Sequence, residues 1–247
     1  MSMAPTIDSP LLADAAWAPD GALILTDRAQ LEKLRRKRMS ISVASTLEQC
    51  PASFVKKLLP QRADPFGARE LGIESHAVLD AFYQLPGMAR TQVALQQEVI
   101  DRATHVWDSD RVARRIGREG LYEDELAADP DYDIPARISR DRNRWIETVY
   151  GGVLGVFSLE TPSDVDVEGT ERSISAMIQG VPITVTVDRI LRRPDGTLLV
   201  DDWKFAAESK LNPRDDARDD YADQGRVYTK VIEQERGEQV SQMRLIF

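Results

Sequence analysis

Two aspartates and a lysine near residue 200 have the types and spacing needed for metal-assisted chemistry. The segment after Asp164 alternates in polarity and is rich in Val, Ile and Thr, with a Pro-Asp-Gly turn at 194–196. This pattern predicts a strand followed by a hairpin, or a three-strand meander. If the turn is a three-residue loop, Asp188 lies opposite Asp202, whereas a two-residue loop would shift the register by one. Because side chains alternate along a strand, Asp202 and Lys204 would share one face.

Opposed carboxylates repel each other, so this arrangement predicts a compensating cation. Mg²⁺ prefers oxygen ligands, and the backbone carbonyl of Trp203 could add a third oxygen to Asp188 and Asp202. Lys204 would then lie beside a bound water and a scissile phosphate, where it could orient the water or stabilise developing charge. The alternative is a surface hairpin in which Lys204 bridges two aspartates, and an isolated motif of this length favours that alternative.

The chain that must position these residues has an ordinary globular composition. It contains 247 residues, 42% hydrophobic and 30% charged, with a mean hydropathy of −0.37 and no apolar run of membrane-spanning length. The N-terminus lacks the pattern of a signal peptide, so we expect a cytoplasmic protein without a membrane anchor. The net charge of −9 argues against a protein that coats nucleic acid non-specifically through a basic surface. It does not exclude an enzyme that acts on nucleic acid.

Hydrophobic spacing predicts a mainly helical middle third followed by strands. The expected helices span 67–85, 91–117 and 136–157, with an exposed acidic loop at 119–133. A helix at 219–233 and a strand at 239–247 follow the hairpin. Before residue 60 we expect a strand at 21–26, a basic helix at 29–39 and a capped helix from Ser45 to residue 59. This order indicates an α/β or α+β domain with a helical insert.

Five separated motifs resemble, in order, those of the RecB-like nucleases of the PD-(D/E)XK superfamily, which include CRISPR-associated and phage recombination exonucleases. They cover 45–247, and each lies in a matching helix or strand context. The motifs are Ser45-Thr-Leu-Glu-Gln-Cys-Pro51, Gly72-Ile-Glu-Ser-His76, Gly180 through Asp188-Arg189-Ile190, Asp202-Trp203-Lys204 and Gln224-Gly-Arg-Val-Tyr228. The resemblance implies a restriction-endonuclease-like α/β core, a small mixed sheet flanked by helices with a helical insertion.

The resemblance also implies a role for each matching residue. Asp188 and Asp202 would be metal carboxylates, His76 a further metal ligand and Lys204 the catalytic lysine. Gln224 and Tyr228 share a helix face, which in the family borders the active site and positions the lysine or a phosphate. A glutamate one strand earlier would be Glu171, with Glu168 as its competitor. Taken alone, His76 would be read as a core histidine, and Gln224 and Tyr228 as half-buried polar residues.

We therefore expect residues 1–40 to be a lead-in with a basic helix and 41–247 to be the nuclease domain. Its helical insert would span about 88–158 and its catalytic core about 164–247. The expected function is Mg²⁺- or Mn²⁺-dependent hydrolysis of DNA, most simply as an exonuclease acting on single strands or duplex ends. The alternative is a catalytically idle DNA-binding or adaptor module with a protein partner in a recombination or CRISPR-type complex.

Cys50 is the one cysteine of the chain and occupies the Cys-Pro motif, where many relatives hold an iron–sulfur cluster with four cysteines. One thiolate cannot hold such a cluster, so we expect none. Other residues are left without a role. His105 has no motif around it. Trp17, Trp107 and Trp145 could stack on nucleobases, but Trp on a helix face is more often a core residue, so they are assigned no role. The arginines spaced along a helix could contact a phosphate backbone or form a solvated face: Arg111, Arg114, Arg115 and Arg118.

Overall fold

The computed structural model describes residues 15–17, 23–25, 64–205 and 215–246, and it describes side chains for 64–205 and 221–246. The expected basic helix at 29–39 and the capped helix that contains Cys50 lie outside the described residues. The chain divides into two compact units, residues 1–61 with 177–184 and residues 62–176 with 185–247. Within the first unit, β1 (Ala15–Trp17) pairs antiparallel with β2 (Leu23–Leu25), which is the strand expected near residue 21.

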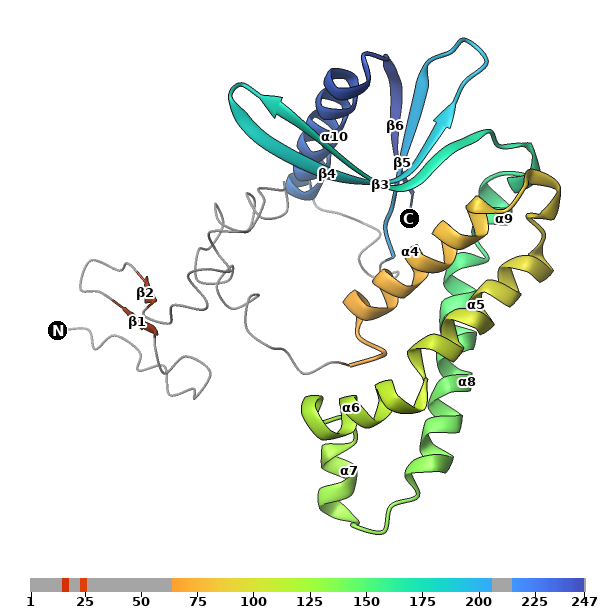
Figure 1. Cartoon of the computed structure of the whole chain (residues 1–247), viewed down its shortest axis with the longest axis vertical. Coiled ribbons are helices and arrows are strands. Elements are labelled where there is room, and N and C mark those ends of the chain that lie inside the picture. The colour runs from red at the N-terminus through yellow and green to blue at the C-terminus, as the bar shows by residue number, and fades with distance from the viewer. Residues whose placement is uncertain (1–14, 18–22, 26–63, 206–214, 247) are drawn as a thin grey trace. The chain divides into compact units, whose positions relative to one another are not determined.

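A mixed sheet of four strands carries the hairpin predicted around residue 195 (Figure 1). The strands follow the order β3 (Val167–Ile178), β4 (Val181–Arg192), β5 (Leu198–Trp203) and β6 (Val240–Ile246). The antiparallel pairing of β4 with β5 places Arg189 opposite Asp201, which is the register of the three-residue loop. Gly196 has a φ of 85°, a turn conformation that glycine adopts without steric cost.

The last strand returns to the sheet by a crossover. β6 pairs parallel with β5, placing Arg244 beside Asp201, and α10 (Asp215–Arg236) forms the connection that a parallel pair requires. All six residues of β5 are buried, because this strand has a neighbour on each side and helices over its face. The result is the expected α/β class, with a small mixed sheet flanked by helices.

The helices that precede the sheet in the chain form a separate layer (Figure 1). α4 (Ala68–Gln84) packs against α5 (Gln92–Val106) and α8 (Ile134–Val153), and α5 and α8 also pack together. Short helices complete the layer: α6 (Ser109–Glu119), α7 (Glu123–Ala128), α9 (Val156–Leu159), η2 (Gly87–Ala89) and η3 (Pro162–Asp164). Among the described residues, no helix combines the length and apolar character needed to cross a bilayer.

Three helix predictions were wrong in detail. The single helix expected at 136–157 is divided into α8 and α9. The single helix expected at 91–117 is broken after Val106, because the Asp108 carboxylate accepts hydrogen bonds from the backbone N–H groups of Asp110 and Arg111 and starts α6. The exposed loop expected at 119–133 contains α7. Tyr122, at the start of α7, is buried, and its hydroxyl donates to the Asp141 carboxylate of α8 at 3.0 Å. This contact ties the acidic segment to the helical layer.

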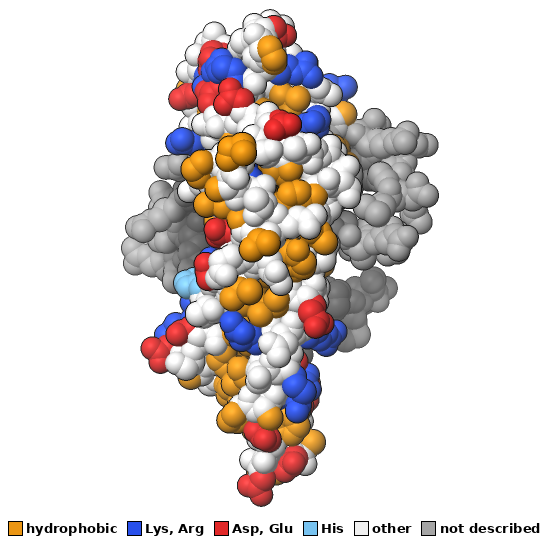
Figure 2. Space-filling model, turned by 90° about the vertical axis from the view of Figure 1, so that its right-hand side faces the viewer, with side chains coloured by type: hydrophobic (Ala, Val, Ile, Leu, Met, Phe, Trp, Pro, Cys, Tyr) orange, Lys and Arg blue, Asp and Glu red, His pale blue; other side chains and the backbone are white. Residues whose placement is uncertain are grey.

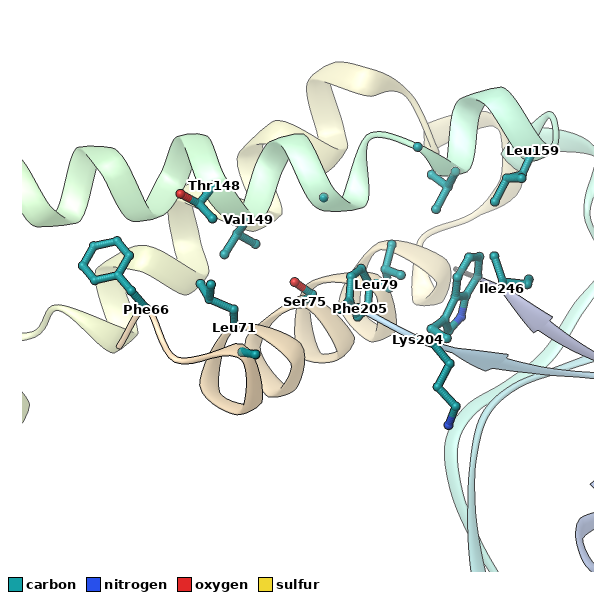
Figure 3. Close-up of a pocket in the computed structure, with 15 residues that line it drawn as sticks. Phe66, Leu71, Ser75, Leu79, Thr148, Val149, Leu159, Lys204, Phe205 and Ile246 are labelled. Atoms are coloured by element: carbon teal, nitrogen blue, oxygen red, sulfur yellow. The ribbon is translucent and has the colours of Figure 1, made fainter. Parts of the chain in front are cut away.

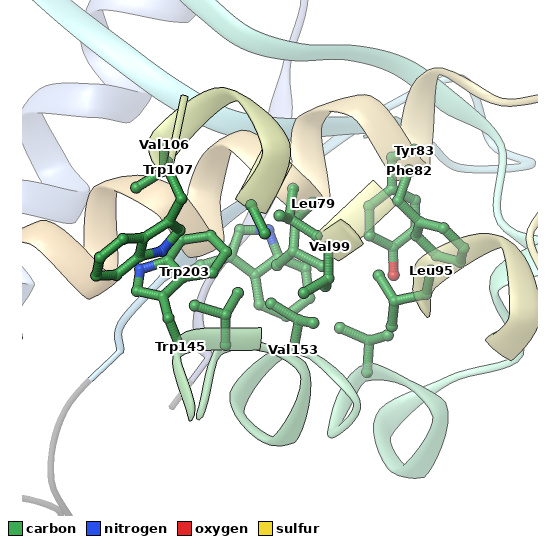
Figure 4. Close-up of a cluster of buried hydrophobic side chains, with 14 of the residues drawn as sticks. Leu79, Phe82, Tyr83, Leu95, Val99, Val106, Trp107, Trp145, Val153 and Trp203 are labelled. Atoms are coloured by element: carbon green, nitrogen blue, oxygen red, sulfur yellow. The ribbon is translucent and has the colours of Figure 1, made fainter. Parts of the chain in front are cut away.

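The helices enclose an aromatic-rich core (Figure 4). Trp145 is fully buried and Trp107 nearly so, together with Leu95, Val99 and Phe82. The expectation that Trp107 and Trp145 serve the core rather than a nucleobase is therefore confirmed. Trp203 of β5 belongs to the same cluster, so the strand that carries the predicted site is anchored in this core.

A buried arginine joins the sheet to the end of the helical layer. Arg189 of β4 is fully buried and donates hydrogen bonds to the carboxylates of Asp201 and Glu160. Arg244 of β6 donates to Asp201 at 2.6 and 2.9 Å. Burial favours the neutral form of Glu160, but hydrogen bonds and charge from Arg189, with Tyr83 and Arg244, hold its pKa below the usual range. The Asp201 side chain therefore lies on the face of the sheet that packs against the core, where it pairs with arginines.

Candidate active site

Three side chains from three different elements converge at the sheet. His76 of α4, Glu171 of β3 and Asp188 of β4 have potential ligand atoms that all lie within 4.8 Å of one another. His76 Nδ1 is 3.3 Å from Asp188 Oδ1 and 3.5 Å from Glu171 Oε1. An imidazole with two carboxylates at this spacing is a donor set suited to a divalent cation.

The position of His76 follows from the amphipathic character of α4. One face of this helix buries Val78, Leu79 and Phe82 in the core, whereas His76 lies at the edge of that face. Burial lowers the pKa of His76, but hydrogen bonds to Asp188 and Glu171 and their charges outweigh it and raise the pKa to about 9. His76 therefore balances the charge of the two carboxylates.

Asp188 is oriented by the strand beside it. Its Oδ2 atom accepts a hydrogen bond of 2.6 Å from the backbone N–H of Trp203, so the Oδ1 atom is left to face His76. The Trp203 side chain lies in the core, stacked against Tyr83 with ring centroids 6.3 Å apart. Because a backbone group on a buried strand holds it, the Asp188 carboxylate is preorganised and does not need to reorient when a ligand binds.

Of the two competing glutamates, the structure places Glu171 at the site. Glu168 forms ion pairs with Arg192 and Arg236 instead. Glu171 has a φ of 46°, which non-glycine residues adopt at an energetic cost and which is often found at functional sites. The strained residue of β3 is therefore the same residue whose carboxylate contacts His76.

Asp202 and Lys204 form an ion pair next to this cluster. The ammonium of Lys204 contacts Asp202 Oδ2, which is buried. Burial raises the pKa of Asp202, as does the nearby charge of Asp188, whereas Lys204 opposes the shift. The predicted separation of neighbouring aspartates is thus observed, because Asp201 pairs with arginines in the core and Asp202 pairs with Lys204. Asp202 lies beside the cluster of His76, Glu171 and Asp188 rather than within its 4.8 Å limit.

Helix α10 adds a polar face to the site. Burial raises the pKa of Tyr228 to about 12, with further contributions from the charges of Asp202, Asp188 and Glu171, whereas the neighbouring Gln224 side chain opposes the shift. Tyr228 consequently stays protonated near three carboxylates and can donate a hydrogen bond. Sequence reasoning missed Tyr221, whose ring centroid is 5.8 Å from Lys204 Nζ. Its spacing with Gln224 and Tyr228 on one helix face was the available signal.

The remaining candidates lie away from these contacts. His105 is exposed on α5, in line with its lack of a motif. On α6, Arg115 forms an ion pair with Glu119, and Arg114 and Arg118 are exposed. For Trp203 the structure gives a role to the backbone N–H, while its carbonyl as a metal ligand stays a prediction. Oxygen and imidazole donors at the centre fit a hard divalent cation such as Mg²⁺ or Mn²⁺.

Comparison with known proteins identifies the family of the chain. A family model described as the PD-(D/E)XK nuclease superfamily matches residues 38–247, which is most of the chain. A search of curated proteins found no match. Members of this superfamily are generally metal-dependent nucleases, so the match supports a hydrolase that uses a divalent metal. The chain belongs to the PD-(D/E)XK nuclease superfamily.

Proposed function

We propose that this protein is a Mg²⁺- or Mn²⁺-dependent DNA nuclease of the RecB-like type that acts as an exonuclease on single strands or duplex ends. The observation that carries the proposal is the convergence of His76, Glu171 and Asp188 beside the Asp202–Lys204 ion pair. A catalytically idle module of this fold would have no need to gather Asp188 and Asp202 beside a lysine.

The roles follow from the contacts of each residue. His76, Glu171, Asp188 and Asp202 would hold the cation. When bound there, a divalent cation would lower the pKa of water and neutralise charge on the phosphate. Lys204 would donate hydrogen bonds to the scissile phosphate or to the attacking water, since its ammonium already lies at the carboxylates. Tyr228, which stays protonated, would donate a hydrogen bond on the same side, and Gln224 would orient it.

The distribution of charge suggests how DNA would be recruited. On the face shown in Figure 2, acidic and basic side chains are mixed at both ends, and hydrophobic side chains lie between them. With a net charge of −9, non-specific attraction to DNA would be weak. Recruitment would therefore depend on the end of the strand, on contacts at the site, or on a protein partner from a recombination or CRISPR-type complex.

A nuclease assay tests the proposal directly. End-labelled single-stranded and double-stranded DNA and a covalently closed circle are incubated with Mg²⁺, Mn²⁺ or EDTA. We expect linear DNA to be degraded with either metal, the circle to survive, and EDTA to abolish all loss of label. Cleavage of the circle would replace exonuclease with endonuclease. A folded protein that cleaves none of these substrates would favour the idle DNA-binding or adaptor module.

The two neighbouring glutamates provide a matched test of the metal site. Glu171→Gln should weaken Mn²⁺ binding by about tenfold or more, because it removes one charged ligand. Glu168→Gln makes the same chemical change on the same strand but alters only ion pairs with Arg192 and Arg236. Isothermal titration or Mn²⁺ electron paramagnetic resonance measures the affinity. Equal affinities for the two variants would remove Glu171 from the site.

A further inference from the structure

A groove extends along α4 and α8 and passes the stem of Lys204 (Figure 3). Its volume is about 480 Å³, within the range of ligand pockets, and most of its wall is apolar. Phe66 lies at one end, Phe205 lies near the middle, and Leu159 and Ile246 lie at the other end (Figure 3). The aliphatic part of the Lys204 side chain forms part of the groove wall, while its ammonium contacts Asp202 outside the groove. One side chain thus belongs to both the groove and the candidate active site.

Phe205 makes a second connection between the groove and the site. Its ring packs edge-on against the imidazole of His76, with centroids 5.3 Å apart, while it also lines the groove. An occupant that contacts Phe205 would therefore be next to the residue proposed to hold the cation. The groove and the proposed catalytic centre therefore share a wall, formed by Phe205 and the stem of Lys204.

A polar group inside the groove has no partner in the described part of the chain. Ser75 is only 3% exposed, and its hydroxyl points into the space between α4 and α8 (Figure 3). Because no hydrogen bond within the described residues engages it, the Ser75 hydroxyl is available to an occupant of the groove. Ser75 is thus an isolated hydrogen-bonding group in a mainly apolar wall, the pattern of a site that orients a ligand.

Positive charge lies beside the Phe66 end of the groove. Arg144 is exposed on α8, and its guanidinium lies 4.6 Å from the ring centroid of Phe66. The aliphatic stem of Lys204 also lines the groove, but its ammonium is paired with Asp202 outside it. Aromatic rings beside a cation match a ligand that carries flat apolar faces next to anionic groups, as an unpaired DNA strand does.

Glycine keeps the middle of the groove open. Gly152 lines it near the end of α8, where a glycine costs about 1 kcal/mol relative to alanine. A Cβ atom placed on Gly152 would come to 3.9 Å from Phe205, an ordinary contact, so a side chain there is tolerated but extends into the groove. Gly151 is its neighbour on the same helix, has open space around it and does not line the groove.

We infer that this groove binds unpaired nucleotides of the DNA strand next to the scissile phosphate. Bases would stack on Phe66 and Phe205, Ser75 would donate to or accept from a base edge or sugar, and Arg144 would contact a phosphate. The inference rests on the proposed nuclease function and refines it, because only a strand that is single at the site can enter. Single strands and frayed ends are then the preferred substrates over blunt duplex.

The two glycines allow a test without loss of a native contact. Gly152→Leu fills the groove, and Gly151→Leu makes the same change one residue earlier. Fluorescence anisotropy with a labelled oligothymidylate in EDTA measures binding without hydrolysis. We expect Gly152→Leu to weaken binding at least about fivefold, the loss expected for one stacked base, and Gly151→Leu to match the wild type. Cleavage of the same oligonucleotide with Mg²⁺ should slow in parallel.

The outcomes separate this inference from the proposed function. If the two variants bind equally well and the wild-type protein cleaves DNA, the groove does not bind the strand, but the proposed nuclease function stands. A clear fall in the melting temperature of Gly152→Leu alone would also overturn the groove inference, because the groove would then hold part of this chain. Weaker binding by Gly152→Leu from a protein that never cleaves would support the groove and reject the nuclease. A wild type that neither binds nor cleaves rejects both.

Discussion

Replacing Lys204 with methionine should reduce the rate of DNA hydrolysis about 100- to 1000-fold, the effect of removing one donor from a developing anion. Methionine retains most of the aliphatic stem that lines the groove but lacks the ammonium that contacts Asp202. The loss should appear as a lower turnover rate with DNA affinity changed much less, because the charge acts mainly in the transition state. Single-turnover kinetics on an end-labelled oligonucleotide measure the chemical step.

Lys230→Met is the matched control for this change. Lys230 is exposed near the end of α10, away from the Asp202–Lys204 pair, so its replacement should leave the rate unchanged. Circular dichroism of both variants establishes that each is folded. Hydrolysis by Lys204→Met at the wild-type rate would exclude the lysine from catalysis and with it the proposed mechanism.

The adjacent aspartates should respond to substitution in opposite ways. Asp201→Asn should lower the free energy of unfolding by about 3 kcal/mol or more, because the buried Arg189 and the partly exposed Arg244 lose a shared charged partner. Asp202→Asn should leave stability unchanged or raise it, because the ionised carboxylate is buried and its pKa is raised. The same variant should lose DNA hydrolysis, since Asp202 is a proposed metal ligand.

Urea unfolding followed by tryptophan fluorescence gives the stability of both variants, and each is compared with wild type at one metal concentration and in EDTA. A stability loss that is equal for the two variants would show that the two faces of β5 are not separated in function. Full activity of Asp202→Asn would remove that residue from the site while leaving the structural role of Asp201 untouched.

Local patterns were sufficient to predict the parts of the site that depend on strand alternation. The Pro-Asp-Gly turn set the register of β4 and β5, so the opposite orientations of Asp201 and Asp202 could be anticipated. Helical spacing also placed Gln224 and Tyr228 on one face. The approach of His76 from a distant helix depended on family resemblance, because periodicity alone describes it as an edge residue of an amphipathic helix.

Other features depend on contacts that no local pattern contains. Glu160 follows a short helix without periodicity, and only the folded chain shows that it shares Arg189 with Asp201. The break between α5 and α6 was missed because apolar residues continue at helical spacing across it. Asp108 was a capping signal within that stretch, but it competed with a long amphipathic pattern. The strained backbone of Glu171 likewise has no signature in residue type.

The parallel pairing of β5 with β6 has a consequence for the order in which the protein is made. During translation, Lys204 leaves the ribosome before α10 and β6, which follow within about 40 residues, a delay of a few seconds at typical synthesis rates. Until β6 emerges, β5 has an open edge, and Asp201 lacks its partner Arg244. Tyr228 also arrives after the carboxylates that surround it. A nascent chain paused in this interval would carry every acidic residue of the site and still lack the assembled centre.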